Sequence, residues 1–196
     1  MYPEFQVPGI SPDDIWQLFN VSNYAYYCKK VDSLLQGVCG FCQIDPELNK
    51  TLYENDAWRV WENNLAAQEG QDYQFVIPSK RHLGNIDEVN YKEWFLLAEA
   101  TRWINREFSI DGGVLLVRSG NPLRNAKSMP HLHFNYHVPT GRDRVTVTIA
   151  KSSKNLVEKL PILQVFEKMR QGMSFEELSE EERSLVEDKM APKGAC

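Results

Sequence analysis

The sequence contains no long apolar run, no excess of basic residues and no internal repeat. No stretch approaches the ~20 consecutive apolar residues of a membrane-spanning helix, so no membrane partner is expected. The net charge of −5 argues against a nucleic-acid-binding surface as the main function, although a local phosphate pocket remains compatible with it. With 196 residues, 42% of them hydrophobic, the chain can bury a substantial core as one domain, or as one domain plus an appendage.

Cysteine is scarce, and the first residues lack the basic region and apolar run of a secretory signal. We therefore expect a cytoplasmic setting without a disulfide framework. Cys39 and Cys42 are two residues apart, the spacing that lets adjacent thiolates share one tetrahedral zinc ion. A redox pair and two buried free thiols are the alternatives, although Asp45-Pro46 opposes the helix that usually follows a redox pair. Cys28 is expected to be a core residue on the first helix.

Alternating and helical hydrophobic patterns predict an α+β fold. Short strands are expected over residues 51–55, 58–61, 73–77 and 114–117. The most regular helical pattern covers residues 88–108. Residues 145–149 alternate cleanly and predict a strand that forms an antiparallel hairpin with segment 131–137. The sum is an antiparallel sheet of about five strands with one long helix.

Both ends of the chain have helical patterns. Residues 11–14, Ser-Pro-Asp-Asp, begin a helix that could run towards Leu35, with an interruption near residues 20–23. Residues 156–170 are predicted to be helical despite Pro161. Capping boxes that begin at Ser174 and Ser179 precede a short acidic helix, which is expected to end near residue 189.

Three of the four histidines lie in segment 131–137, whose sequence is HLHFNYH. In a strand, successive side chains point to opposite faces. One face would then carry four polar residues, His131, His133, Asn135 and His137. The apolar residues between them would pack on a core, which leaves the imidazole face for a ligand.

Two chemistries suit several imidazoles on one strand face. Neutral histidine is a common zinc ligand. A histidine ring nitrogen can also attack an electrophile while the other ring nitrogen is held as N–H by a carbonyl or a neighbouring histidine. A purely structural cluster is the third interpretation, and three histidines in alternation count against it.

The polar loop before this segment offers donors suited to phosphate. These donors are Asn121, Arg124, Lys127 and Ser128. Ser128 is the strongest candidate because it lies three residues before His131. Arg124 and Lys127, each taken alone, could equally be solvated surface cations.

Taken together, these motifs resemble the histidine triad (HIT) family. Segment 131–137 resembles the family's His-φ-His-φ-His-φ-φ motif, where φ is hydrophobic, and Cys39-Gly-Phe-Cys42 resembles its Cys-x-Phe-Cys opener. Residues 77–83, which include His82, resemble the proline-to-histidine segment before the family's long helix. Ser128 occupies the Ser/Thr position ahead of the triad. The resemblance extends over roughly residues 37–150.

This resemblance implies a HIT-like fold and a nucleotidyl hydrolase or transferase. His133 would attack the α-phosphate of a nucleoside phosphate or dinucleoside polyphosphate and form a covalent nucleotidyl-histidine. The resemblance also implies a structural zinc ion, whose ligands would be Cys39, Cys42, His82 and His131. The expected partner is a small nucleotide, and homodimers are common among such proteins.

The same resemblance divides the chain into three parts. They are an N-terminal helical segment (1–36), a HIT-like catalytic domain (37–150) and a helical C-terminal extension (151–196). The extension could cover the site, contact a second subunit or complete the core, and its apolar residues at helical spacing favour packing.

Two positions depart from the triad. Asn135 replaces the third histidine, and His137 replaces a hydrophobic residue. An amide at this position is reminiscent of the branch with galactose-1-phosphate uridylyltransferase and dinucleoside tetraphosphate phosphorylases, which use a non-water acceptor. An amide can donate to a phosphate oxygen at any working pH, and His137 could partly replace the missing imidazole. The alternative function is a catalytically impaired, zinc-containing nucleotide-binding module, and a metal-dependent hydrolase is a third.

Overall fold

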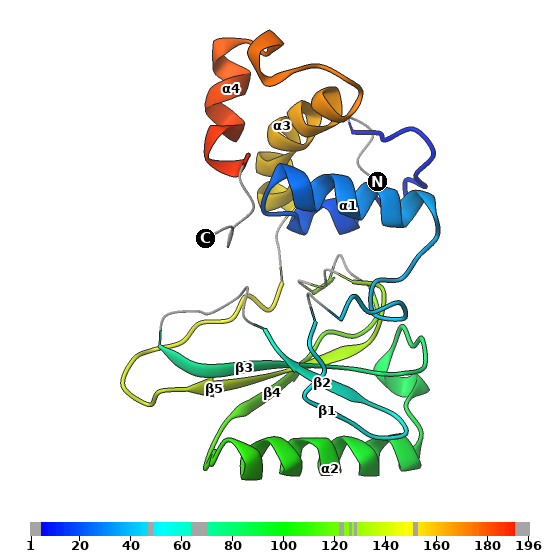
Figure 1. Ribbon diagram of the computed structural model, residues 1–196, viewed down its shortest axis with the longest axis vertical. Coiled ribbons are helices and arrows are strands. Elements are labelled where there is room, and N and C mark those ends of the chain that lie inside the picture. Colours follow the sequence, from blue (N-terminus) through cyan, green and yellow to red (C-terminus); the bar gives the residue numbers. More distant parts are fainter. Residues whose placement is uncertain are drawn as a thin grey trace. The chain divides into compact units, whose positions relative to one another are not determined.

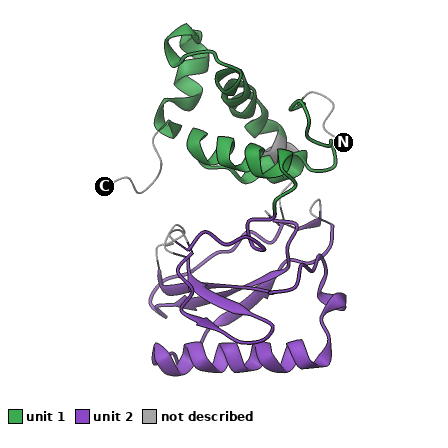
Figure 2. Cartoon of the chain, turned by 45° about the vertical axis from the view of Figure 1, so that its right-hand side comes forward, with its two compact units in different colours: residues 1–38, 151–196 green, residues 39–150 purple. Residues whose placement is uncertain are grey.

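The computed structural model describes residues 5–46, 49–63, 70–121, 124–125, 127, 129–150 and 153–190. The chain divides into two compact units (Figure 2). Residues 39–150 form the sheet unit, and residues 1–38 together with 151–196 form the helical unit. Within the described ranges, no helix is long and apolar enough to cross a membrane.

Among the described residues, the sheet unit contains one antiparallel sheet of five strands (Figure 1). The strands are β1 (Tyr53–Glu54), β2 (Arg59–Glu62), β3 (Gln71–Pro78), β4 (Val114–Val117) and β5 (His133–Pro139). Their order in the sheet is β1-β2-β3-β5-β4, and every pairing is antiparallel. The predicted α+β class is confirmed.

One long helix, α2 (Tyr91–Glu107), covers one face of this sheet (Figure 1). It begins after a capping box between Asn90 and Glu93, just beyond the short 3-10 helix η3 (Ile86–Glu88). The buried face of α2 packs on the apolar side of β5, where Phe134 and Tyr136 belong to the same core. The predicted helix over residues 88–108 is confirmed, with a later start.

The predicted hairpin between residues 145–149 and the histidine strand is wrong. β5 pairs with β3 on one side and β4 on the other, so both of its edges are occupied. Residues 143–150, which we call the strap, adopt no regular secondary structure. One end of the strap lies beside Gly70, where an added Cβ would meet Val145 at 3.4 Å, and further along Arg118 donates to the Thr148 carbonyl at 2.9 Å. Figure 1 shows the strap on the side of the sheet away from α2.

The helical unit combines both ends of the chain. Its elements are the 3-10 helix η1 (Ile15–Asn20), α1 (Tyr24–Leu35), α3 (Ser153–Arg170), the 3-10 helix η5 (Phe175–Glu177), α4 (Glu180–Val186) and the 3-10 helix η6 (Glu187–Lys189). Asn23 caps α1 by accepting from the Tyr26 amide, so the predicted interruption near residues 20–23 is confirmed. The predicted capping boxes at Ser174 and Ser179 are also confirmed.

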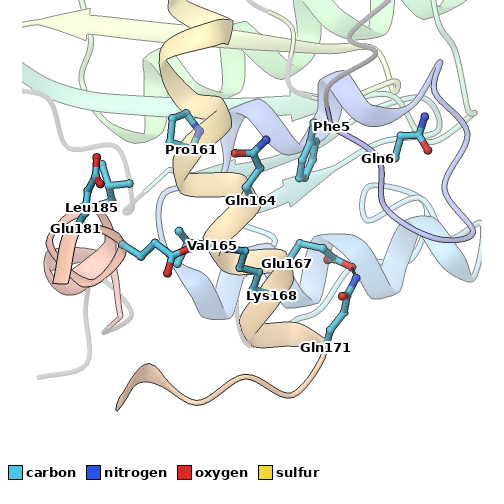
Figure 3. Close-up of a pocket in the computed structure, with 11 residues that line it drawn as sticks. Phe5, Gln6, Pro161, Gln164, Val165, Glu167, Lys168, Gln171, Glu181 and Leu185 are labelled. Carbon is cyan, nitrogen blue, oxygen red and sulfur yellow. Dashed lines mark hydrogen bonds and ion pairs between the residues drawn. The ribbon is translucent and has the colours of Figure 1, made fainter. Parts of the chain in front are cut away.

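The helical unit is held by a common apolar core and a buried polar contact. Leu18 and Val31 from the first segment pack with Leu163 from the second. The Tyr27 hydroxyl donates to Glu167 at 2.7 Å across 140 residues of sequence. A cavity of about 550 Å³ lies between α3, α4 and the segment at Phe5 and Gln6 (Figure 3).

Candidate active site and metal site

The register of the sheet arranges the polar face of β5 in three rows. Phe134 and Tyr136 belong to the core shared with α2, so alternation turns the residues between them to the opposite face. Along that face the rows are Pro78–His133, Val76–Asn135–Leu116 and Gln74–His137–Val114. Arg118 follows β4 directly and, by continuation of the register, lies in the row of His133. The alternation predicted for residues 131–137 is therefore present over residues 133–137, whereas His131 lies before the strand.

His131 lies just before β5, which begins at His133. It is fully buried, and its side chain joins Cys39, Cys42 and His82. The ligand atoms of these four residues all lie within 4.8 Å of one another. Cys42 Sγ is 3.2 Å from His82 Nδ1 and 3.4 Å from His131 Nδ1, and Cys39 Sγ is 3.4 Å from the same nitrogen. Zinc bonds of about 2.0–2.3 Å in a tetrahedron give edges near 3.5 Å, so the donor set fits a zinc ion.

The hydrogen bonds of His131 prepare it for a metal. Its Nε2 lies 2.7 Å from the Ser79 carbonyl oxygen, which can only accept, so Nε2 carries the proton. The lone pair is then on Nδ1, the atom that faces both thiols. Carbonyl partners of this kind commonly orient metal-bound histidines.

The two thiols differ in acidity. Burial raises the pKa of Cys39, but hydrogen bonds outweigh it and lower that pKa to about 6. They come from His131, when Nδ1 also carries a proton, and from two backbone amides, and a metal ion on Nδ1 would take the place of that proton. The pKa of Cys42 is raised to about 11 by burial and by the neighbouring Cys39. One thiolate thus forms readily, and its negative charge opposes the second. A divalent cation between them would remove this conflict.

The cysteine loop also packs Phe41 on the histidine strand. The Phe41 ring meets the His133 ring edge-on at 5.0 Å between centroids, and it contacts His131 and Trp61 at 5.7 and 5.5 Å. The loop therefore supplies metal ligands and a wall beside His133.

His133 is held in one tautomer. Its Nδ1 lies 2.9 Å from the His131 carbonyl oxygen, so Nδ1 carries the proton and Nε2 keeps the lone pair. Burial lowers the pKa of His133 to about 4, and the charge of Arg118 acts in the same direction. The ring is therefore neutral near pH 7, which is the state a nucleophile requires.

Asn135 and His137 present polar atoms that lack partners. Within the described part of the chain, Asn135 Nδ2 and His137 Nε2 are buried without a hydrogen bond, as are Gln74 Oε1 and Arg118 Nε on the same face. His137 Nδ1 lies 2.8 Å from Gln71 Oε1. Buried polar groups normally have partners, so these atoms point to a ligand or to ordered water.

The spacing along β5 separates the proposed roles of Asn135 and His137. Two residues of strand place Asn135 about 7 Å from His133, whereas four residues place His137 about 13 Å away. This separation disfavours the expectation that His137 replaces the third histidine, and Asn135 is the nearer of the two to His133.

The loop donors named from the sequence are dispersed. Asn121 and Arg124 are exposed, whereas Lys127 is buried and donates to the Gly84 carbonyl at 2.8 Å. Ser128 lies outside the described residues. The loop therefore brings Lys127 inward, while Asn121 and Arg124 stay at the surface.

Sequence reasoning did not single out several residues of this face. They are Gln71, Gln74, Ser79 and Arg118. A signal existed for two of them, because Gln74 alternates with Phe75 on a predicted strand and Arg118 is a charge that directly follows a buried-type strand. For Ser79 and Gln71 the sequence held no comparable signal.

No family model matches this sequence, and no curated protein matches it. The fold is similar to a solved HIT family hydrolase from Clostridium thermocellum, with 21% identity over 56% of this chain and 96% of that one, at a TM-score of 0.45. It is also similar to a Zn-bound histidine triad family protein from Mycobacterium smegmatis, with 15% identity over 68% and 95% of the two chains and a TM-score of 0.45. A HIT family hydrolase from Legionella pneumophila is similar as well, with 21% identity over 55% of this chain and 96% of that one, at a TM-score of 0.40. All three are proteins of the family that the sequence motifs resemble.

Proposed function

We propose that this chain is a histidine triad enzyme that transfers a nucleotidyl group through His133. The hydrogen bond from His133 Nδ1 to the His131 carbonyl carries the proposal, because it leaves a neutral ring with its lone pair on Nε2. The substrate would be a nucleoside phosphate or dinucleoside polyphosphate.

The reaction would proceed in two displacements. Nε2 of His133 donates its electron pair to the α-phosphorus, and the bond from that phosphorus to the leaving oxygen breaks with its electrons on the oxygen. Water or another hydroxyl then attacks the same phosphorus, its proton passes to solvent, and the phosphorus–nitrogen bond breaks with its electron pair returning to Nε2. Splitting the transfer in this way replaces one difficult step with two easier ones.

The neighbours of His133 favour leaving groups that depart as anions. An amide donates hydrogen bonds but gives up no proton, so Asn135 can stabilise phosphate oxygens without protonating the leaving group. Arg118 lies in the row of His133 and adds positive charge. We therefore expect phosphoanhydrides to react better than esters of poor leaving groups.

Zinc would act as a structural clamp held by Cys39, Cys42, His82 and His131. Bound there, it would fix the cysteine loop to the residue that precedes the nucleophile, and it would supply no chemistry at phosphorus. Free thiols of this kind suit the cytoplasmic setting expected from the sequence.

The decisive experiment traps the covalent intermediate. The protein is incubated with adenosine polyphosphates labelled at the α-phosphate, quenched in alkali, digested and mapped by mass spectrometry. We expect one acid-labile adenylyl group on His133, absent from His133→Ala and retained in the control Cys28→Ala, whose thiol lies in the helical unit. The proposal fails if no residue is labelled and His133→Ala turns over at the wild-type rate.

One outcome favours the second candidate, a nucleotide-binding module without turnover. It rests on the missing third histidine at Asn135. Tight nucleotide binding by calorimetry, together with no adduct and no turnover, would indicate this function. Asn135→His should then create measurable hydrolysis.

A further inference from the structure

The far row of the polar face contains two hydrogen-bond acceptors that meet no donor. His137 Nδ1 carries a proton because it faces the carbonyl oxygen Oε1 of Gln71, and the other ring nitrogen is then an acceptor. Burial lowers the pKa of His137, which keeps the ring neutral near pH 7. Gln74 lies opposite His137 in the register, and its Oε1 accepts as well. In the described chain neither acceptor has a partner.

The two rows nearer His133 have the opposite character. The unpartnered atoms of Asn135 and Arg118 are donors, Nδ2 and Nε. Donors suit phosphate oxygens, which only accept. The acceptors of Gln74 and His137 suit hydroxyl or amino hydrogens instead. The face thus changes from donors near His133 to acceptors two rows away.

The surroundings of the far row indicate an uncharged group. Its third member is Val114, and the middle row adds Val76 and Leu116. Gln74 and His137 bring no charge of their own near pH 7, and the positive charge of Arg118 also acts on His137. A phosphate placed there would meet acceptors and apolar side chains, whereas a hydroxyl could donate to Oε1 or Nε2.

We propose that Gln74 and His137 form a subsite for a hydroxyl-bearing part of the substrate, about 13 Å along the strand from His133. This inference rests on the proposed function, because it assumes that the phosphate lies at His133. The hydroxyls could belong to the ribose of the nucleotide or to the leaving group, and both would present the same chemistry.

Entry to this subsite requires that covering residues move, since the orphan atoms are closed to solvent. The strap forms no strand pairing and contacts residues beside this face. The end of the strap at Val145 lies beside Gly70, the residue before Gln71. Towards its other end, the strap accepts a hydrogen bond from Arg118 at the Thr148 carbonyl.

Two substrate pairs test the proposal and separate the two sources. The first pair is the 4-nitrophenyl ester of adenosine 5′-phosphate and the same ester of its 2′,3′-dideoxy analogue. The second pair joins 2′,3′-dideoxyadenosine 5′-diphosphate to glycerol or to propanol. Each pair differs only in hydroxyls, the first on the nucleoside and the second on the leaving group.

In one of the two pairs we expect the hydroxylated substrate to have a kcat/KM at least about 10-fold higher, because its analogue leaves buried acceptors unpaired. In Gln74→Leu and His137→Phe that preference should fall to near unity. The matched control is Asp72→Asn, an exposed neighbour on β3, which should keep the preference. A preference in the first pair assigns the subsite to ribose, and one in the second assigns it to the leaving group.

Equal rates within both pairs for the wild-type protein would overturn the proposal, and this comparison needs no variant to fold. A preference that survives in both variants would overturn it as well. Failure of the proposed function is recognised separately, by the absence of an adduct and of turnover. In that case, calorimetry measures the dissociation constants of the same four compounds. A hydroxylated compound that binds at least about 10-fold more tightly than its analogue supports the subsite, and equal binding within both pairs overturns it.

Discussion

Loss of the metal clamp should destabilise the sheet unit strongly. Cys42 is the most informative ligand to remove, because its Sγ contacts both His82 and His131. Cys42→Ala leaves one thiol and two imidazoles, and we expect this set to release zinc at equilibrium. The cysteine loop would then lose its attachment to two segments that are distant in sequence.

The expected magnitude follows from the loops that the ion closes. Cys42 and His82 are 40 residues apart, and a cross-link that closes a loop of this length restricts the unfolded chain by about 4 kcal/mol. For a unit of about 110 residues, with an unfolding entropy near 2.1 cal/mol/K per residue, that energy corresponds to a melting shift of roughly 17 °C. The ion would also join Cys39 and His131 to the same cluster, so this single-loop value gives the order of magnitude.

The assay combines zinc content, measured by atomic absorption, with scanning calorimetry in the presence and absence of a chelator. Wild-type protein should hold one zinc per chain and lose on the order of 15 °C of melting temperature on chelation. Cys42→Ala should resemble the chelated protein, and Cys28→Ala should keep both the ion and the shift. Either of two results would refute the reasoning: a full equivalent of zinc in Cys42→Ala, or a wild-type melting temperature that is the same with and without the chelator.

Three further predictions concern packing and charge. Gly113→Ala should lower the free energy of unfolding by about 1–3 kcal/mol, because the new Cβ would lie 2.7 Å from the Tyr136 ring. Urea titration measures this loss, and an unchanged unfolding midpoint would contradict it. Leu163→Ala should cost the helical unit about 2–5 kcal/mol and leave zinc content unchanged, since Leu163 is fully buried; a smaller loss in the same titration contradicts it. The hydrogen bond from Lys168 lowers the pKa of Glu182 to about 2, so its stabilisation is present above the ordinary value near 4.5 and is lost as pH falls towards 2. Thermal melts followed by circular dichroism should show a smaller loss of melting temperature between pH 5 and pH 2 in Lys168→Met than in the wild type. An equal loss in both proteins would contradict the assignment.

Much of the sheet unit could be predicted because its signals are local. The alternation of residues 133–137 directs their side chains to opposite faces whatever the strand pairs with. Asn90 and Glu93 form a capping box within four residues, so the start of α2 is encoded where it occurs. The spacing of Cys39 and Cys42 likewise restricts both thiols to one ligand cluster.

The remaining features depend on contacts between distant residues. Residues 145–149 have the alternation of a strand, but pairing needs a free edge, and β5 has none beside it. The hydrogen bond from His137 to Gln71 joins residues that are 66 positions apart, so no local sequence pattern predicts it. The hydroxyl of Tyr27 reaches Glu167 only because both ends of the chain share one core.

The histidines of this strand differ because the backbone and the side chain of His131 serve different neighbours. Its imidazole contributes Nδ1 to the thiol cluster, while its carbonyl oxygen accepts the proton of His133 Nδ1. A metal ion bound to the imidazole would therefore also fix the peptide group that sets the tautomer of His133. Phe41 adds a second connection, since it comes from the cysteine loop and packs against the His133 ring. The clamp would thus act on the orientation of His133, and in the proposed reaction the departure at Asn135 would act on how the phosphate and its leaving group are held.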